Sequence, residues 1–162
     1  MYPVTFAQLV FNGAPTRVLG TQHLGDTGVD MTFSALLLYD AGHSAQISSG
    51  FESAYVGAEV VGTAARLEVT SSFFGDIPER RLVLHPYGGT PQQLDPTREL
   101  RYLGEVDALH AAALDGISPP FSLEHSRQHL ATELALYESA HTGRIVPVLA
   151  AGDDVAIPPG SP

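Results

Sequence analysis

A run of residues near the C-terminal end of the sequence has a spacing that could support metal chemistry. His125 and His129 stand four residues apart, and Glu133 follows after four more. On an α-helix this spacing brings the three side chains to neighbouring places on one surface, where imidazole and carboxylate groups could bind zinc. No further ligand accompanies them, and the H-E-x-x-H pattern is absent from the sequence. We therefore expect two solvated histidines and no metal site.

Aromatic residues form a second group with possible chemistry, because several stand near predicted strand ends and helix starts, where pockets are often lined. We take three of them as candidate substrate-binding residues for a small molecule: Phe73, Phe74 and Tyr102. Aromatic side chains at such places also fill hydrophobic cores. Core packing is therefore the alternative explanation for all three.

Composition narrows the chemistry further. The 162 residues include no cysteine, and all eight basic residues are arginines. A thiolate nucleophile, a lysine Schiff base and a P-loop lysine are thus excluded for this chain. The formal charge of −10 would repel nucleic acid and anionic membranes, so we expect neither as a partner. No apolar run of 18 residues and no signal peptide appear in the sequence, which predicts a cytoplasmic protein.

Three helices are expected from the positions of proline, glycine and apolar residues. The first runs over 3–12, with Pro3 in its first turn and Gly13 just beyond its end. The second covers 100–114. The third begins after a capping serine, Ser122, and continues to about His141. A helical wheel of this segment predicts one buried side of the helix, a stripe that contains Leu123, Leu130, Leu134 and Tyr137.

Between the first and second helices the sequence predicts a series of strands. Apolar and polar residues alternate over 29–40, which is typical of a long strand. Shorter strands are expected at 16–24, 44–51, 59–61, 66–70 and 80–85, and an edge strand could lie at 144–148. Short turns between close strands favour antiparallel pairing.

These elements together predict the α+β class. We expect an open, predominantly antiparallel sheet of about six strands, with helices packed on one face. The longest strand has apolar residues on both faces, which predicts that the other sheet face is free for dimerisation. The expected domain covers residues 1–149. Residues 150–162 are rich in proline and glycine and read as a disordered tail.

Several short motifs, taken in order, add a family resemblance. Tyr2-Pro3-Val4-Thr5 opens the first helix, Gly28-Val29-Asp30 opens the long strand, and Gly62-Thr63 precedes a later strand. Residues 102–116 are followed by Ser118-Pro119. In this order and spacing, residues 2–148 resemble the C-terminal domain of the Gfo/Idh/MocA oxidoreductases, in particular the dihydrodiol-dehydrogenase-like members.

The resemblance implies that two domains have different roles in the complete enzyme. An N-terminal Rossmann domain binds NAD or NADP in this family and carries a lysine that helps catalysis; the C-terminal domain supplies part of the substrate pocket and usually the dimer interface. By motif position Tyr2 is the catalytic residue retained in this chain. The implied reaction is hydride transfer at a hydroxyl of a sugar, cyclitol or dihydrodiol. The sequence contains no G-x-G-x-x-G fingerprint, so we expect this chain alone to bind no cofactor and to be inactive.

Two other functions stay open from the residues alone. One is a stand-alone, non-catalytic α+β module that dimerises or binds a ligand. The other is a histidine-dependent metalloenzyme, which would rest on His125, His129 and Glu133.

Overall fold

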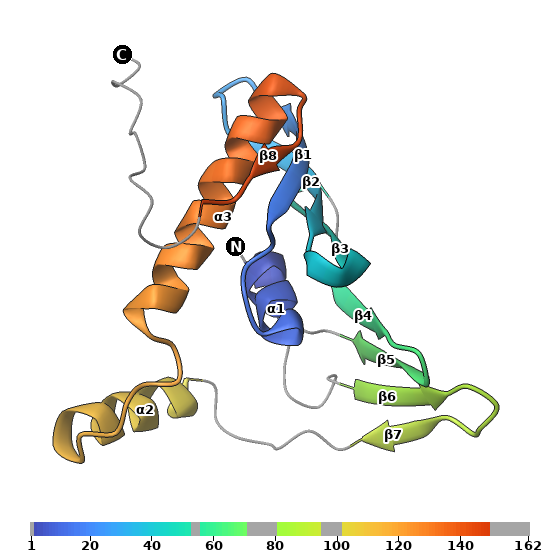
Figure 1. The fold of residues 1–162 in the computed structure, drawn as a ribbon, viewed down its shortest axis with the longest axis vertical. Helices are drawn as coiled ribbons and strands as arrows, with labels where there is room; N and C mark the ends of the chain where they lie inside the picture. The colour runs from blue at the N-terminus through green and yellow to red at the C-terminus, as the bar shows by residue number, and fades with distance from the viewer. Residues whose placement is uncertain (1, 53–55, 71–80, 95–101, 150–162) are drawn as a thin grey trace. The chain divides into compact units, whose positions relative to one another are not determined.

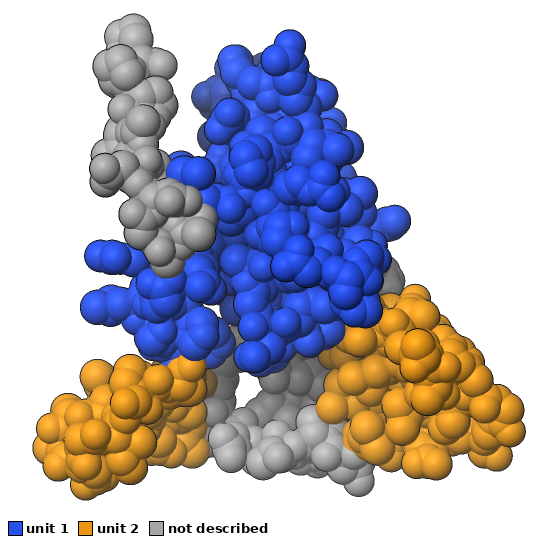
Figure 2. All heavy atoms as spheres, in the orientation of Figure 1, with its two compact units in different colours: residues 1–53, 121–162 blue, residues 54–120 orange. Residues whose placement is uncertain are grey.

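The computed structural model describes residues 2–52, 56–70, 81–94 and 102–149. The chain divides into two compact units, residues Met1–Ser53 with Phe121–Pro162 and residues Ala54–Pro120 (Figure 2). Each unit is described by itself below. In the described part of the chain, no helix combines the length and apolar character that a membrane crossing requires.

Unit 1 is a four-stranded antiparallel sheet with two helices (Figure 1). The strand order is β3-β2-β1-β8. Its elements are α1 (Tyr2–Phe11), β1 (Arg17–Leu24), β2 (Asp30–Leu38), η1 (Asp40–Gly42), β3 (Ser44–Gly50), α3 (Leu123–Thr142) and β8 (Val146–Pro147). The last helix and strand therefore return to the first ones, and residues more than a hundred positions apart share one sheet.

The core of unit 1 lies between the sheet and the two helices. Val18 of β1 is paired with Leu37 of β2, and both side chains are fully buried. Val4 and Ala7 of α1 reach the same cluster as Ala135 and Leu136 of α3, together with Phe33 and Val146. Since these sheet residues share one face, α1 and α3 pack on the same side of the sheet, as expected from the sequence.

The opposite face of this sheet carries more polar side chains. Leu19 is paired with Leu36, and Thr21 is paired with Ser34, which in turn pairs with Ser48 of β3. Leu19, Thr21 and Ser48 are exposed, whereas Leu36 is half-buried. Among the described residues of unit 1, both helices contribute their buried side chains to the other face.

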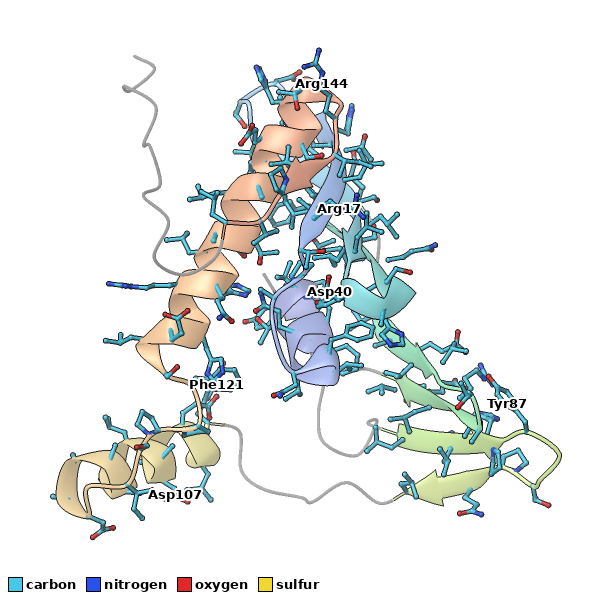
Figure 3. The ribbon with its side chains drawn as sticks, in the orientation of Figure 1. Arg17, Asp40, Tyr87, Asp107, Phe121 and Arg144 are labelled. Atoms are coloured by element: carbon cyan, nitrogen blue, oxygen red, sulfur yellow. The ribbon has the colours of Figure 1, made fainter. Side chains whose placement is uncertain are left out.

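Unit 2 contains a second four-stranded antiparallel sheet, of order β4-β5-β6-β7, and one helix. Its elements are β4 (Gly57–Val61), β5 (Ala65–Thr70), β6 (Arg81–Pro86), β7 (Gln92–Leu94) and α2 (Leu103–Leu114). Tyr87 directly follows β6 (Figure 3). One face of the sheet holds a charged row, in which Arg66 pairs with Glu59 and lies 3.8 Å from Glu68, and His85 Nε2 lies 3.1 Å from the same Glu68 carboxylate.

The α+β class and the antiparallel pairing are confirmed. In place of about six strands in one sheet, the described residues hold eight strands in two groups of four. β7 is not among the strands predicted from the sequence, since Gln92-Gln93-Leu94 is short and shows no apolar alternation. The boundary at residue 149 stays a prediction, and the tail 150–162 lies outside the described residues.

The predicted buried stripe of α3 is wrong. Leu130, Leu134 and Tyr137 are 56%, 48% and 50% exposed, and Leu123 is 85% exposed. The buried residues of α3 are instead Thr132, Ala135, Leu136 and Ser139. They lie on the opposite side of the helix, and three of the four are small or hydroxyl-bearing.

Close approach of the helix to β1 explains this inversion. A Cβ atom added to Gly20 of β1 would lie 2.8 Å from the backbone oxygen of Leu136 and 3.0 Å from Cζ of Phe33. The helix backbone thus almost touches the strand. Small side chains such as Ala135 and Ser139 suit this close approach. Leu136 is also buried, whereas Leu123, Leu130 and Leu134 lie on the outward side.

Candidate functional site

Tyr2 is the first residue of α1, and its side chain is 53% exposed. Val4 and Ala7 anchor the helix, since they are only 2% and 4% exposed within the core. At 100° per residue, Tyr2 and Leu9 fall on the helix side opposite to these anchors. The helix therefore presents the Tyr2 phenol away from the sheet while its other side is held by the core.

A hydrogen-bonded cluster fastens α1 to α3. The amide of Gln8 donates from Nε2 to Thr132 Oγ1 at 3.1 Å, and its Oε1 lies 3.3 Å from Nδ1 of His129. Thr132 is fully buried. On the other side of the imidazole, Nε2 of His129 lies 3.2 Å from Oε1 of Glu133. Four side chains from two helices are therefore linked in one chain of contacts.

The donors and acceptors of this cluster can be assigned one after another, starting from Thr132. The hydroxyl of Thr132 donates to the backbone oxygen of Gln128 at 2.8 Å, so it accepts from the Gln8 amide. The Gln8 carbonyl oxygen then faces His129 and accepts from Nδ1–H. The contact between His129 Nε2 and Glu133 becomes an ion pair when the ring carries both protons.

Tyr137 continues this polar row one turn beyond Glu133. Its ring meets Phe33 edge-on at a centroid distance of 5.5 Å, and the carboxylate of Asp30 in β2 is near its hydroxyl. Partial burial, followed by the neighbouring carboxylates of Asp30 and Glu133, raises the pKa of Tyr137. The phenol consequently stays protonated and remains a hydrogen-bond donor at neutral pH.

His125 does not join His129 and Glu133. Its backbone N–H donates to Ser122 Oγ at 3.2 Å, and its Nδ1 accepts from the Ser122 backbone N–H at 3.2 Å. The residue therefore closes the N-terminus of α3 as part of a capping box. Within the described residues, no group of three histidine or acidic side chains could hold a metal ion.

The other candidate substrate-binding residues are placed less completely. Tyr102 directly precedes α2, with φ of 67° and 68% of its side chain exposed. It belongs to unit 2 and Tyr2 to unit 1, and each is described within its own unit. Phe73 and Phe74 lie outside the described residues. The roles of all four stay predictions.

Gln8 and Thr132 are not indicated by the sequence. They are separated by 124 positions, and neither residue type in isolation indicates a site. The available signal was the unusual position of Thr132, a polar residue on a helix whose opposite side carries leucines.

The described residues do not offer a dinucleotide site. NAD and NADP are usually held by a glycine-rich turn between a parallel strand and a helix, whereas the strand pairs described in both units are antiparallel. We therefore derive no chemical step through a cofactor on this part of the protein. That the isolated chain binds none remains a prediction.

The proteins compared with the chain are about twice as long as the region that matches it. The chain is 35% identical over 151 residues to D-xylose 1-dehydrogenase (NADP(+)) 2 from Haloferax volcanii, and the match covers 90% of this chain and 45% of that protein. The chain thus spans about half the length of the curated relative it matches. No protein-family model matches the chain.

Solved structures with the same fold are also oxidoreductases. The aldose-aldose oxidoreductase from Caulobacter crescentus, crystallised with glycerol, superposes with a TM-score of 0.81 at 19% identity, over 90% of this chain and 45% of that one. An oxidoreductase from Agrobacterium radiobacter, in complex with NAD+, L-tartaric acid and magnesium, gives a TM-score of 0.71 at 14% identity, over 90% and 46%. At these identities the likeness shows the fold.

The α+β fold and these relatives indicate an oxidoreductase domain that matches about half the length of each compared protein. The chain is similar over about half of their length to oxidoreductases of the Gfo/Idh/MocA type, which agrees with the resemblance seen in the sequence.

Proposed function

We propose that the chain is the substrate-side domain of an NAD(P)-dependent oxidoreductase that acts on a hydroxyl group of a sugar, with a cyclitol or dihydrodiol as related substrates. The observation that carries this proposal is the 35% identity over 151 residues to a D-xylose dehydrogenase that uses NADP+. The cofactor would be held by a dinucleotide-binding domain outside the 162 residues. That cofactor, when bound, supplies the hydride acceptor.

Tyr2 is the residue of this chain that we propose at the reacting hydroxyl. A phenol can donate a hydrogen bond to a substrate oxygen and can exchange a proton with it when a neighbouring cation assists. The anchoring of α1 through Val4, Ala7 and the Gln8 cluster supports this role, since the phenol is exposed but its helix is held on two sides. Proton transfer would depend on a cation from the other domain, because this chain has no lysine.

The first experiment measures cofactor binding by the 162-residue chain. Titration with NADPH, followed by fluorescence and by calorimetry, is expected to show no saturable binding at micromolar concentration. Saturable binding would contradict the assignment of the cofactor to another domain.

The second experiment measures activity in a joined polypeptide, in which the part of the Haloferax enzyme outside the match is fused to this chain. We expect NADP+-dependent oxidation of D-xylose. Tyr2→Phe is expected to lower kcat by at least about tenfold, a fall within the range for loss of a proton-transfer group. Tyr87→Phe is the matched control, since Tyr87 is also more than half exposed at 58%. Equal activity of the two variants would remove Tyr2 from the reaction.

We also propose that two copies associate through the open face of the unit 1 sheet. Leu19 and Leu36 lie opposite each other on this face, beside the hydroxyl row of Thr21, Ser34 and Ser48. A surface of leucine and hydroxyl side chains suits a sheet-to-sheet dimer. In sedimentation of the 162-residue chain, Leu19→Glu should shift the mass from dimer to monomer, whereas Leu9→Glu on α1 should not. A monomeric parent chain at high concentration would disprove the dimer.

A further inference from the structure

The C-terminal end of α1 holds a residue in an uncommon backbone conformation. Asn12 directly follows the helix, and its φ of 53° lies in the left-handed region, which asparagine tolerates better than most other residues. The backbone N–H of the next residue, Gly13, donates to the carbonyl oxygen of Gln8 at 3.0 Å. A left-handed residue enclosed by such a bond is the Schellman ending of a helix.

The pair Asn12-Gly13 also has a reactivity of its own. Asn12 is the single asparagine among the 162 residues, and its side chain is exposed. The backbone nitrogen of the residue after an asparagine can attack the side-chain amide carbon, and glycine obstructs this attack least because it has no side chain. No described heavy atom lies within 4 Å of a Cβ placed on Gly13, so the space beside the reacting atoms is open.

Gln8 connects this turn with the buried contact between α1 and α3. Its backbone oxygen accepts the Gly13 N–H, while its side chain donates to Thr132 Oγ1 and lies 3.3 Å from Nδ1 of His129. Thr132 is fully buried. Unwinding of the last turn back to Gln8 would break these side-chain contacts as well, so the contacts with α3 favour the closed turn.

We propose that Asn12-Gly13 is a deamidation site and that the contact of Gln8 with α3 controls its rate. The backbone nitrogen of Gly13 loses its proton and bonds to Cγ of Asn12, and the side-chain nitrogen takes up a proton and leaves as ammonia. Water then opens the cyclic imide at either carbonyl, which gives aspartate or isoaspartate at position 12. While the Gly13 N–H is donated to Gln8, the nitrogen keeps its proton, so the reaction proceeds from the opened turn.

The products weaken the turn that limits their formation. Each adds a negative charge at the C-terminal end of α1, where the helix dipole is also negative and where the last turn holds no basic residue. Isoaspartate in addition lengthens the backbone at position 12 by one carbon atom. This shifts the Gly13 N–H away from the carbonyl oxygen of Gln8.

Mass spectrometry of incubated protein tests the site itself. The 162-residue chain is kept in neutral buffer, once folded and once unfolded in guanidinium chloride, and peptide mapping assigns the deamidated position. We expect the reaction at position 12 to be at least about tenfold slower in the folded chain, because only the opened turn reacts. Equal rates in the two states would overturn the protection by the turn. An unreactive Asn12 in the unfolded chain would overturn the site.

Thr132→Val tests the control by Gln8, since it removes the hydroxyl that accepts from Gln8 and leaves α1 unchanged. Thr142→Val is the matched control. Both threonine hydroxyls donate at 2.8 Å to the backbone oxygen four residues earlier, but Thr142 is exposed and lies at the other end of α3. Two rates are measured in each variant, deamidation at position 12 and hydrogen exchange of the Gly13 amide.

We expect Thr132→Val to raise both rates by about fivefold, the effect of one lost hydrogen bond on the opening of the turn. Thr142→Val should change them by less than about twofold. Unchanged rates in Thr132→Val would overturn the control by Gln8. So would an equal rise in the exchange of the core amides of Val18 and Leu37, which would indicate a general loss of stability.

A Thr132→Val protein that fails to fold is replaced by Gln8→Met. This variant removes the same contact from the side of α1 and leaves α3 unchanged. The same rise in both rates supports the proposal, and unchanged rates overturn it.

Discussion

The backbone N–H of Gly20 in β1 donates to the side-chain oxygen of Ser139 in α3, with 2.9 Å between the two atoms. β8 pairs with β1 only at Arg17 and Val18, so the N–H of Gly20 lies beyond the end of that strand. The Ser139 hydroxyl itself donates to the backbone oxygen of Arg144, which follows α3 (Figure 3). One buried serine therefore joins the helix, the sheet and the turn after the helix.

A methyl group at position 20 should disturb this contact. In Gly20→Ala the new Cβ would lie 2.8 Å from the Leu136 backbone oxygen, which cannot rotate away. We expect the free energy of unfolding to fall by about 1–3 kcal/mol, as for other overpacked sites. Gly13→Ala is the control, because no heavy atom lies within 4 Å of a Cβ there. Urea unfolding of both variants measures the difference, and equal stabilities would show that α3 can move away from β1.

Removal of the Ser139 hydroxyl should lower the free energy of unfolding through the loss of buried hydrogen bonds. Ser139→Ala leaves the Gly20 N–H and the Arg144 carbonyl without this buried partner, and we expect a loss of about 1–3 kcal/mol. Ser126→Ala serves as the comparison, since the Ser126 hydroxyl also donates to a backbone oxygen but is exposed. Thermal unfolding that ranks the two variants equally would contradict the role given to Ser139.

The buried hydroxyl group of Tyr39 predicts a substitution that stabilises the protein. Its hydroxyl is buried and has no hydrogen-bond partner among the residues that the structure describes, and its ring lies 4.2 Å from that of Phe11, measured between centroids. Tyr39→Phe should therefore raise the free energy of unfolding by about 1 kcal/mol at neutral pH. Tyr87→Phe, at an exposed position, should change it by less than about 0.5 kcal/mol. A destabilised Tyr39→Phe protein would mean that the hydroxyl has a partner in solution.

The ionisation of Tyr39 predicts that the stability of the fold depends on pH in the alkaline range. Burial raises the pKa of Tyr39 to about 12 from its ordinary value of 10.0. The folded protein holds the phenolic proton more tightly than the unfolded chain, so this contribution is fully present below pH 10 and is lost as the pH rises towards 12. Urea unfolding between these values should show wild type losing stability relative to Tyr39→Phe. Parallel curves would place the Tyr39 phenol in solvent.

The net charge of the chain predicts that its melting temperature depends on the salt concentration. At −10 the folded chain repels itself, and added NaCl should raise its melting temperature by screening that repulsion. Asp26→Asn keeps a residue that suits the turn but removes one negative charge. It should melt higher than wild type at low ionic strength, and the difference should vanish in concentrated NaCl. A melting temperature that falls with salt would show that ion pairs outweigh the repulsion.

Local elements were predictable because their signals act over a few residues. Ser122 accepts the N–H of His125 at the start of α3, and Gly143 ends that helix in the left-handed conformation, with φ of 67°. The alternation that predicted a strand over 29–40 corresponds to β2. This strand pairs antiparallel with β1, which precedes it in the chain. Each of these features is determined by neighbours in the chain.

The candidate site was only half predictable. The i, i+4 spacing brought His129 to Glu133, as helix geometry requires, but it also predicted His125 beside them, which the capping box prevents. The partner that matters, Gln8, comes from the other end of the chain. No pattern within one helix could indicate it.

From the sequence alone follow the α+β class, the antiparallel pairing and the ends of most helices, because propensity, capping and alternation act locally. Tertiary structure decided which side of α3 is buried and that α1 is tied to α3 through Gln8. The physical reason is distance: the backbone of α3 comes close to β1 at Gly20, and the buried side of the helix, with Thr132, Ala135, Leu136 and Ser139, was decided by this packing and not by the leucine pattern, which left Leu130 and Leu134 outside.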